Sequence, residues 1–181
     1  MNAKEAQIAY ENADCIYNNN QVQSAIDTIV KQITNKLSDK DPLVLCVMTG
    51  GIIPAGHILT RLDFPLQIDY IHATRYQGET KGGKLNWFVR PSQSLRGRTV
   101  LIIDDIYDEG VTLSEIVEYC SAEGADAVYT AVLVNKLHDR KRGDKPDFVC
   151  LETDDRYLFG YGMDFRGYLR NIPGIYAIKD T

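Results

Sequence analysis

The sequence predicts an α/β fold in which a mostly parallel sheet is flanked by helices. Continuous apolar runs at 42–48 and 99–104 are typical of strands that are buried on both faces. Segments with helical periodicity alternate with such runs, which favours parallel strands joined by crossover helices. A chain of 181 residues is the size of one domain, so we expect a single domain over residues 1–181.

The elements are expected in the following order along the chain. A short helix is predicted over 3–13, and a longer one runs from a predicted N-cap, Asn20, to Asp41-Pro42. Two more helices are predicted over about 54–62 and 113–123, the second with a capping box formed by Thr112 and Glu115. Strands are predicted at 42–48, 66–73, 85–89, 99–104, 127–134, 147–152, 158–163 and 175–178.

Composition and charge disfavour several classes of protein. The net charge is -5, whereas broad nucleic-acid surfaces are basic, so no nucleic-acid partner is expected. No apolar run approaches the ~20 residues of a membrane helix, and the first residues lack the apolar core of a signal peptide. The four scattered cysteines contain no C-x-x-C pair, which disfavours zinc. We expect a cytoplasmic protein with reduced thiols and no membrane partner.

The segment IIDDIYDEGVTL, at 102–113, carries an unusual density of acids where a predicted strand gives way to a helix. The first N–H groups of a helix lack partners and attract anions, so this turn suits a phosphate, helped by the Thr112 hydroxyl. Asp104 and Asp105 are then suited to bind the vicinal hydroxyls of a ribose, or a divalent cation. Asp108 is suited to contact a proton on another group of the ligand. Neither a P-loop nor a G-x-G-x-x-G pattern is present.

This segment is similar to the phosphoribosyl pyrophosphate motif of type I phosphoribosyltransferases. From Pro42 onward, the chain resembles hypoxanthine-guanine phosphoribosyltransferases in particular. The resemblance implies the type I phosphoribosyltransferase fold with a small hood subregion. It also implies purine salvage: phosphoribose moves from phosphoribosyl pyrophosphate to hypoxanthine, with guanine as the second expected base, giving IMP or GMP and pyrophosphate.

The resemblance assigns the acidic turn to the sugar phosphate. In this family the paired acids contact the ribose hydroxyls, and the turn after them holds the 5′-phosphate. Asp108 matches the residue near N7 of the purine, a candidate general base or acid. The implied ribose- and phosphate-binding set is Asp104, Asp105, Asp108, Glu109, Gly110, Val111 and Thr112.

Pyrophosphate and magnesium have their own implied residues. The segment VMTGGIIP resembles the pyrophosphate-binding loop, with Thr49 where many relatives carry lysine, and the family often has a cis peptide bond at the position of Met48-Thr49. Pyrophosphate is a highly charged leaving group, so Mg²⁺ is the implied cofactor. The implied pyrophosphate-binding residues are Thr49, Gly50, Gly51, Arg140 and Arg170, and the implied magnesium-side acids are Asp104, Asp105 and Asp164.

The purine site is implied by two further segments. Lys136 matches the family lysine that contacts O6 of the purine, and a lysine only donates hydrogen bonds, which selects 6-oxopurines over adenine. Tyr157 matches the aromatic residue that stacks on the base, Leu158 would offer its backbone groups, and Asp164 lies at the same end of the site. His138 is expected to be a bystander.

A mobile hood over the reacting centre is implied by ATRYQGETKGGK, which places a loop at about 74–86. Relatives often show Ser-Tyr in this loop, where this chain has Arg75-Tyr76. Relatives are usually dimers or tetramers, so the resemblance also implies a homodimer or a homotetramer.

Two alternatives remain open. A xanthine-preferring phosphoribosyltransferase would keep the fold, because Lys136 does not separate hypoxanthine from xanthine and the pocket near Leu158 would have to. An RNA-binding regulator on the same fold would need a clustered basic face. The dense basic stretch that could supply one consists of Lys136, Arg140, Lys141, Arg142 and Lys145.

Overall fold

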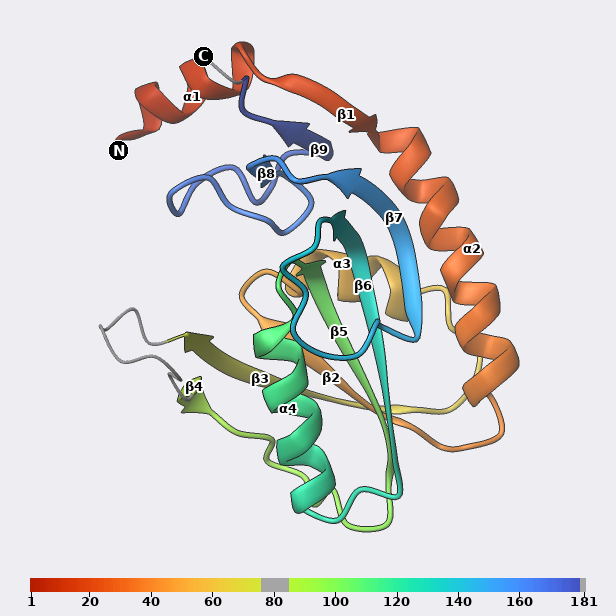
Figure 1. Ribbon diagram of the computed structural model, residues 1–181. Helices are drawn as coiled ribbons and strands as arrows, with labels where there is room; N and C mark the ends of the chain where they lie inside the picture. The colour runs from red at the N-terminus through yellow and green to blue at the C-terminus, as the bar shows by residue number, and fades with distance from the viewer. Residues whose placement is uncertain (76–84, 180–181) are drawn as a thin grey trace.

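A computed structural model describes residues 1–75 and 85–179 (Figure 1). The predicted hood loop falls mostly between these ranges, so Tyr76 lies outside the described residues. Arg75 is the last residue of a strand, and its backbone pairs with Leu85. Among the described residues, no helix combines the length and apolar character that crossing a membrane requires.

A six-stranded sheet forms the centre of the molecule and confirms the predicted fold class. Its strand order is β4-β3-β2-β5-β6-β7, and every neighbouring pair is parallel except β3 and β4. β5 and β6 are buried over most of their length because helices cover both faces. The strands are β2 (Leu43–Met48), β3 (Gln67–Arg75), β4 (Leu85–Val89), β5 (Thr99–Tyr107), β6 (Ala127–Leu137) and β7 (Phe148–Asp154).

Three helices cover the two faces of this sheet (Figure 1). α2 (Asn19–Leu37) and α3 (Ile52–Leu59) pack on one face, where α2 buries apolar side chains at helical spacing. α4 (Val111–Ala122) packs on the other face through Leu113 and Ile116. The sheet therefore separates two apolar cores.

The predicted N-cap of the long helix is wrong by two residues. α2 is capped by Asn18, whose side chain accepts a hydrogen bond from Gln21 N while Gln21 Oε1 accepts one from Asn18 N. Asn20 is followed three residues later by Gln23 in the same pattern, so the local sequence allows both starts. The preceding strand β1 (Asp14–Asn18) ends at Asn18, and the helix begins directly after it.

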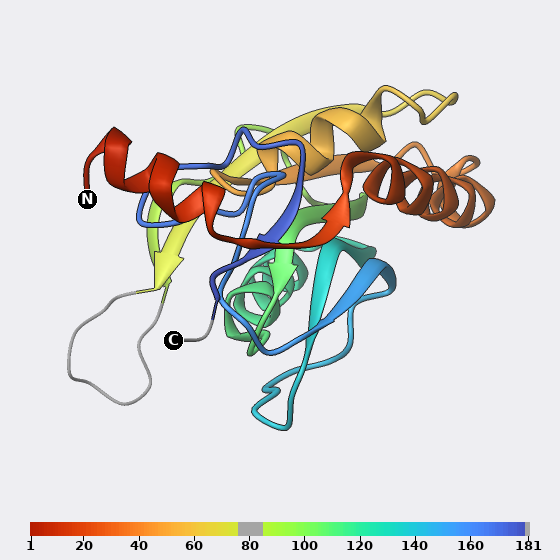
Figure 2. The same cartoon turned by 90° about the horizontal axis from the view of Figure 1, so that it is seen from above.

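A small antiparallel sheet lies beyond the carboxyl ends of the large sheet's strands (Figures 1 and 2). Its order is β1-β9-β8, with β8 at Leu158–Phe159 and β9 at Gly174–Ala177. The sequence did not predict β1. The predicted strand at 158–163 is shortened to β8 because Gly160 and Gly162 adopt left-handed backbone angles, with φ of 93° and 112°.

The N-terminal helix α1 (Ala3–Glu11) packs against the small sheet. The Tyr10 ring meets Tyr176 of β9 edge-on, with ring centroids 5.0 Å apart, and it also meets Phe159 of β8. Since β8 follows Tyr157 directly, this aromatic contact ties the start of the chain to one wall of the predicted purine site.

Candidate active site

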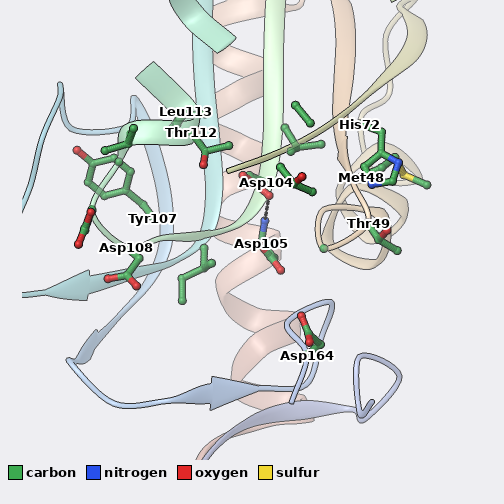
Figure 3. A pocket seen from close by; sticks show the side chains of 18 of the residues that line it. Met48, Thr49, His72, Asp104, Asp105, Tyr107, Asp108, Thr112, Leu113 and Asp164 are labelled. Atoms are coloured by element: carbon green, nitrogen blue, oxygen red, sulfur yellow. Dashed lines mark hydrogen bonds between the residues drawn. The ribbon is translucent and has the colours of Figure 1, made fainter. Parts of the chain in front are cut away.

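A cavity of about 440 Å³ opens at the carboxyl ends of β2 and β5, where such sheets bind their ligands (Figure 3). Figure 3 shows Asp104 and Asp105 between Asp108 on one side and Thr49 on the other, with Asp164 across from them. The predicted site residues that line this cavity are Thr49, Gly50, Asp104, Asp105, Asp108, Glu109, Gly110, Val111, Thr112, Asp164 and Arg170.

The turn after β5 leads into α4 without a side-chain cap. The predicted capping box at Thr112 is wrong: the N-cap is Gly110, with φ of 87° and no side-chain hydrogen bond to the helix. The positive φ favours glycine at this position. The first turn of α4 lines the cavity through Val111, Thr112 and Leu113, so its positive dipole end is directed at the space a ligand would occupy.

Asp104 and Asp105 are buried side by side at the end of β5. Their exposed fractions are 9% and 8%, and Asp105 N donates a hydrogen bond of 2.8 Å to Asp104 Oδ1. Burial raises the pKa of both carboxyls, and the neighbouring charge of Asp105 raises the pKa of Asp104 further. Two crowded carboxylates of this kind favour a cation or hydroxyl donors in the cavity.

Arg170 connects the small-sheet side of the molecule to these acids. Its Nη2 lies 2.7 Å from Asp164 Oδ1, its Nη1 lies 3.9 Å from Asp105 Oδ2, and Nη1 donates to the Gly162 carbonyl at 2.6 Å. One guanidinium therefore faces a site that also contains Asp104, and the local charge remains negative.

The loop that the resemblance assigns to pyrophosphate follows β2 directly. The Met48-Thr49 peptide bond is cis, as the resemblance implies. Thr49 and Gly50 line the cavity, whereas Gly51 is buried behind it and lies outside the cavity lining.

A second cavity, of about 230 Å³, adjoins the first and shares Asp105, Ile106, Asp108 and Asp164 with it. Lys136, Tyr157, Leu158 and Met163 complete its lining. The lining thus contains all four residues that the resemblance assigns to the purine, which are Lys136, Tyr157, Leu158 and Asp164.

The backbone of Leu158 is oriented toward this second cavity by the register of the small sheet. Leu158 lies opposite Ala177, and the flanking Ile178 N donates to Tyr157 O at 3.1 Å. This pattern makes Leu158 and Ala177 a non-hydrogen-bonded pair, so the N–H and C=O groups of Leu158 point away from β9. The Tyr157 ring is half-exposed and rests against Phe165, with ring centroids 5.4 Å apart.

Asp108 lines both cavities, and its carboxylate contacts the side chains of His138 and Lys136. His138 Nε2 lies 2.8 Å from Asp108 Oδ1, and Lys136 Nζ lies 3.4 Å from Oδ2. Burial alone would raise the pKa of Asp108, but the His138 hydrogen bond and the Lys136 charge outweigh it and lower the pKa below its usual value. The carboxyl is therefore ionised at neutral pH and able to accept a proton.

The sequence predicts that His138 takes no part in the site, but in the structure this residue lies against Asp108. Its side chain is 6% exposed and contacts Asp108 directly. The sequence carries no clear signal for this contact, because β6 ends at Leu137 and His138 lies in the bend that follows it.

Lys141 is a second residue whose position the sequence did not reveal. Its Nζ donates to the carbonyl oxygens of Tyr107 and Asp108, at 2.9 and 2.6 Å, and to Asn135 Oδ1 at 3.0 Å. Burial lowers the pKa of Lys141. The ammonium group thus binds the backbone at the start of the turn after β5.

Most cations of the dense basic stretch have acidic or carbonyl partners, which weakens the RNA-binding alternative. Lys136 and Arg140 both contact Asp155, the arginine at 2.7 Å, and Lys145 lies 3.6 Å from Glu152. Arg140, assigned by resemblance to pyrophosphate, is outside the lining of both cavities and uses its guanidinium on Asp155.

One group of possible metal ligands differs from the predicted set. Atoms of Asp108, His138 and Asp155 lie within 4.8 Å of one another. The hydrogen bond between His138 and Asp108 and the ion pairs of Lys136 with both acids account for this grouping. Asp104, Asp105 and Asp164, the acids that the resemblance assigns to magnesium, line the larger cavity, but they do not form such a group among the described residues.

Comparisons with known proteins agree with this geometry. A sequence model described as the phosphoribosyl transferase domain matches residues 12–166. The chain is 30% identical over 167 residues to the hypoxanthine-guanine-xanthine phosphoribosyltransferase of Tritrichomonas foetus, an alignment that covers 92% of this chain and 91% of that protein. It is also 30% identical over 160 residues to the hypoxanthine-guanine phosphoribosyltransferase of Bacillus subtilis (strain 168), covering 88% and 89% of the two chains.

A solved structure gives the same result in three dimensions. This chain superposes on the solved structure of a hypoxanthine-guanine-xanthine phosphoribosyltransferase with a TM-score of 0.85. The two are 28% identical in sequence, and the superposition covers 94% of this chain and 99% of that one. The domain match spans most of the chain, and the relatives align along nearly their full lengths. The chain therefore belongs to the phosphoribosyltransferase family.

Proposed function

We propose that this enzyme transfers phosphoribose from phosphoribosyl pyrophosphate to hypoxanthine and guanine, forming IMP or GMP and releasing pyrophosphate in purine salvage. The observation that carries this proposal is the pairing of Asp108 with Lys136 at the junction of the two cavities. The larger cavity suits a sugar phosphate, and the smaller one suits a flat base. The names of the related enzymes support the same substrates.

Asp108 and Lys136 match one edge of a 6-oxopurine. That edge carries an N7–H donor next to the O6 acceptor, while the protein offers a carboxylate acceptor 3.4 Å from an ammonium donor. In adenine an amino group replaces O6 and would face the ammonium. Tyr157 stacks on the base in this arrangement, and the backbone of Leu158 faces the ring edge near C2.

The reaction balances with Asp108 as proton acceptor. The bond between C1′ and the pyrophosphate oxygen breaks, the bond from N9 to C1′ forms, and the proton on N7 moves to the Asp108 carboxylate. Positive charge develops on the ribose in the transition state. The carboxylates of Asp104 and Asp105 bind the ribose hydroxyls and stabilise that charge.

The 5′-phosphate is held by the turn that begins α4. Main-chain N–H groups from Asp108 to Thr112 and the Thr112 hydroxyl serve as donors in this proposal, and Glu109, Gly110 and Val111 form the turn between them. The uncapped first turn of α4 supports this assignment.

Mg²⁺ is the proposed cofactor, because carboxylate oxygens are the kind of ligand that this ion prefers. Asp104, Asp105 and Asp164 offer oxygen ligands in a cavity where one arginine leaves the charge negative. The bound ion would neutralise the pyrophosphate leaving group. Thr49, Gly50, Gly51 and Arg170 are the proposed pyrophosphate contacts, and Arg140 would have to leave Asp155 to join them.

Several finer predictions accompany this proposal. The hood, with Arg75 and Tyr76, would close over the reacting centre, and the chain would form a homodimer or homotetramer. A cytoplasmic location agrees with four cysteines that are all unpaired.

Xanthine is a further candidate base. The relative from Tritrichomonas foetus is named for hypoxanthine, guanine and xanthine together. Xanthine differs from hypoxanthine at C2, the position nearest the Leu158 backbone in the proposed pose.

A panel of bases tests the proposal. Hypoxanthine, guanine, xanthine and adenine are each incubated with the enzyme, phosphoribosyl pyrophosphate and Mg²⁺, and nucleotide formation is followed by ultraviolet absorbance. We expect turnover with hypoxanthine and guanine and none with adenine. Asp108→Ala should lower kcat with hypoxanthine at least about a hundredfold while phosphoribosyl pyrophosphate still binds. Turnover with adenine alone would contradict the proposed substrates.

A further inference from the structure

His138 lies where it can control the orientation of the Asp108 carboxylate. It follows the last residue of β6, its side chain is 6% exposed, and its Nε2 lies 2.8 Å from Asp108 Oδ1. A buried donor at this distance from a carboxylate forms a strong, charge-assisted hydrogen bond.

The neighbouring backbone assigns the proton on the imidazole ring. Arg140 N donates a hydrogen bond of 3.1 Å to His138 Nδ1, so Nδ1 is an acceptor. The proton of the neutral ring therefore resides on Nε2, the nitrogen that faces Asp108. In this tautomer His138 donates to the carboxylate and has no free lone pair at Nε2 with which to accept a proton from it.

The two oxygens of Asp108 consequently have different surroundings. Oδ1 lies 2.8 Å from His138 Nε2, whereas Oδ2 accepts a longer hydrogen bond, of 3.4 Å, from Lys136 Nζ. A purine that draws Lys136 to its O6 would leave Oδ2 available, while Oδ1 stays fixed. The carboxylate plane is then set before the base arrives.

We propose that His138 is a positioning residue that holds Asp108 so that Oδ2 is directed at the N7 proton of the purine. This inference rests on the proposed function, in which Asp108 accepts that proton. The energetic basis is preorganisation: an acceptor already aligned with the proton loses less freedom in the transition state.

Two substitutions separate positioning from a purely structural role. In His138→Gln the amide nitrogen lies close to the place of Nε2 and can still donate to Asp108, but the acceptor for Arg140 N is lost. In His138→Asn the amide oxygen lies close to the place of Nδ1 and can still accept from Arg140 N, but the side chain is too short to reach Asp108. Each variant thus keeps one of the two hydrogen bonds.

The two variants should differ in kcat. We expect His138→Asn to lower kcat with hypoxanthine about tenfold or more, the effect of losing one hydrogen bond to a charged group, with the KM for phosphoribosyl pyrophosphate within about twofold of wild type. His138→Gln should recover most of kcat. A structural role predicts the reverse order, with His138→Gln the more impaired, and that result would overturn the proposal. Thermal unfolding of both variants reports any loss of folding.

Asp108→Asn distinguishes failure of this inference from failure of the proposed function. If Asp108→Asn lowers kcat at least about a hundredfold and His138→Asn has normal kcat, Asp108 remains the proton acceptor and His138 does not position it. If Asp108→Asn keeps a kcat close to that of wild type, the proposed function of Asp108 is wrong, and the inference falls with it. If both single variants are impaired, adding His138→Asn to Asp108→Asn should lower the residual kcat no further, because the two residues act through one carboxylate.

Discussion

Gly50 and Asp105 are in such close contact that a Cβ atom at Gly50 would overlap the Asp105 carboxylate. The contact joins the loop after β2 to the acid pair at the end of β5, two segments that the sequence separates. It also explains why position 50 requires glycine: the requirement comes from space, since Gly50 does not have a positive φ.

Gly50→Ala should therefore disturb the acid pair as well as the pyrophosphate loop. We expect kcat/KM for phosphoribosyl pyrophosphate to fall at least about tenfold, because Asp105 has to move from its buried position. Gly56→Ala is the matched control, since a Cβ there meets nothing within 4 Å and Gly56 lies inside α3. The control should keep full activity and gain about 0.5–1 kcal/mol of stability. Equal activity of the two variants would show that the contact has no role.

Lys136→Met should weaken use of the base more than use of the sugar phosphate. Losing the hydrogen bond from the ammonium to O6 should lower kcat/KM for hypoxanthine about tenfold or more, with the KM for phosphoribosyl pyrophosphate little changed. Initial rates at varied concentrations of each substrate measure both effects. Lys145→Met is the control, because Lys145 lies on the connection that follows β6 and has a side chain that is 71% exposed. Unchanged kinetics with hypoxanthine would remove Lys136 from base recognition.

The buried acid pair predicts a pH dependence of stability. Burial and the charge of Asp105 raise the pKa of Asp104, so the folded chain binds that proton more tightly than the unfolded chain. The resulting contribution to stability is present at low pH and is lost as the pH rises through the folded-state pKa. Asp104→Asn removes this titration. We expect the free energy of unfolding of the variant to exceed that of wild type by about 1–2 kcal/mol at neutral pH, and by less in acid.

Urea unfolding of the ligand-free proteins at about pH 5 and about pH 8 measures this difference. Asp39→Asn is the control, because the Asp39 side chain is 78% exposed. A gain for Asp104→Asn that is the same at both pH values would contradict the assignment.

Removal of Mg²⁺ should stop the reaction. With excess chelator, the negative cavity formed by Asp104, Asp105 and Asp164 would lack the ion that neutralises pyrophosphate, so turnover should fall below detection. Added Mg²⁺ should restore it, which serves as the control for damage by the chelator. Full activity in chelator would rule out the proposed role of the ion.

The sequence by itself determined the features that depend on local pattern. Apolar runs such as Leu43–Met48 predict buried strands because burial on both faces leaves no polar alternation. The order of acids, glycine and threonine at 102–113 predicts a turn that binds phosphate after β5. The structure has residues of this turn lining the cavity, and phosphate binding stays a prediction.

Only the tertiary structure decided the features that depend on partners distant in sequence. β1 is a short strand of five residues that exists through its pairing with β9, more than 150 residues away along the chain. His138 and Lys141 acquire their positions from contacts with the turn after β5, and Arg140 is directed to Asp155. Local propensity cannot specify such contacts, because their free energy arises only when packing of the sheet brings the two segments together.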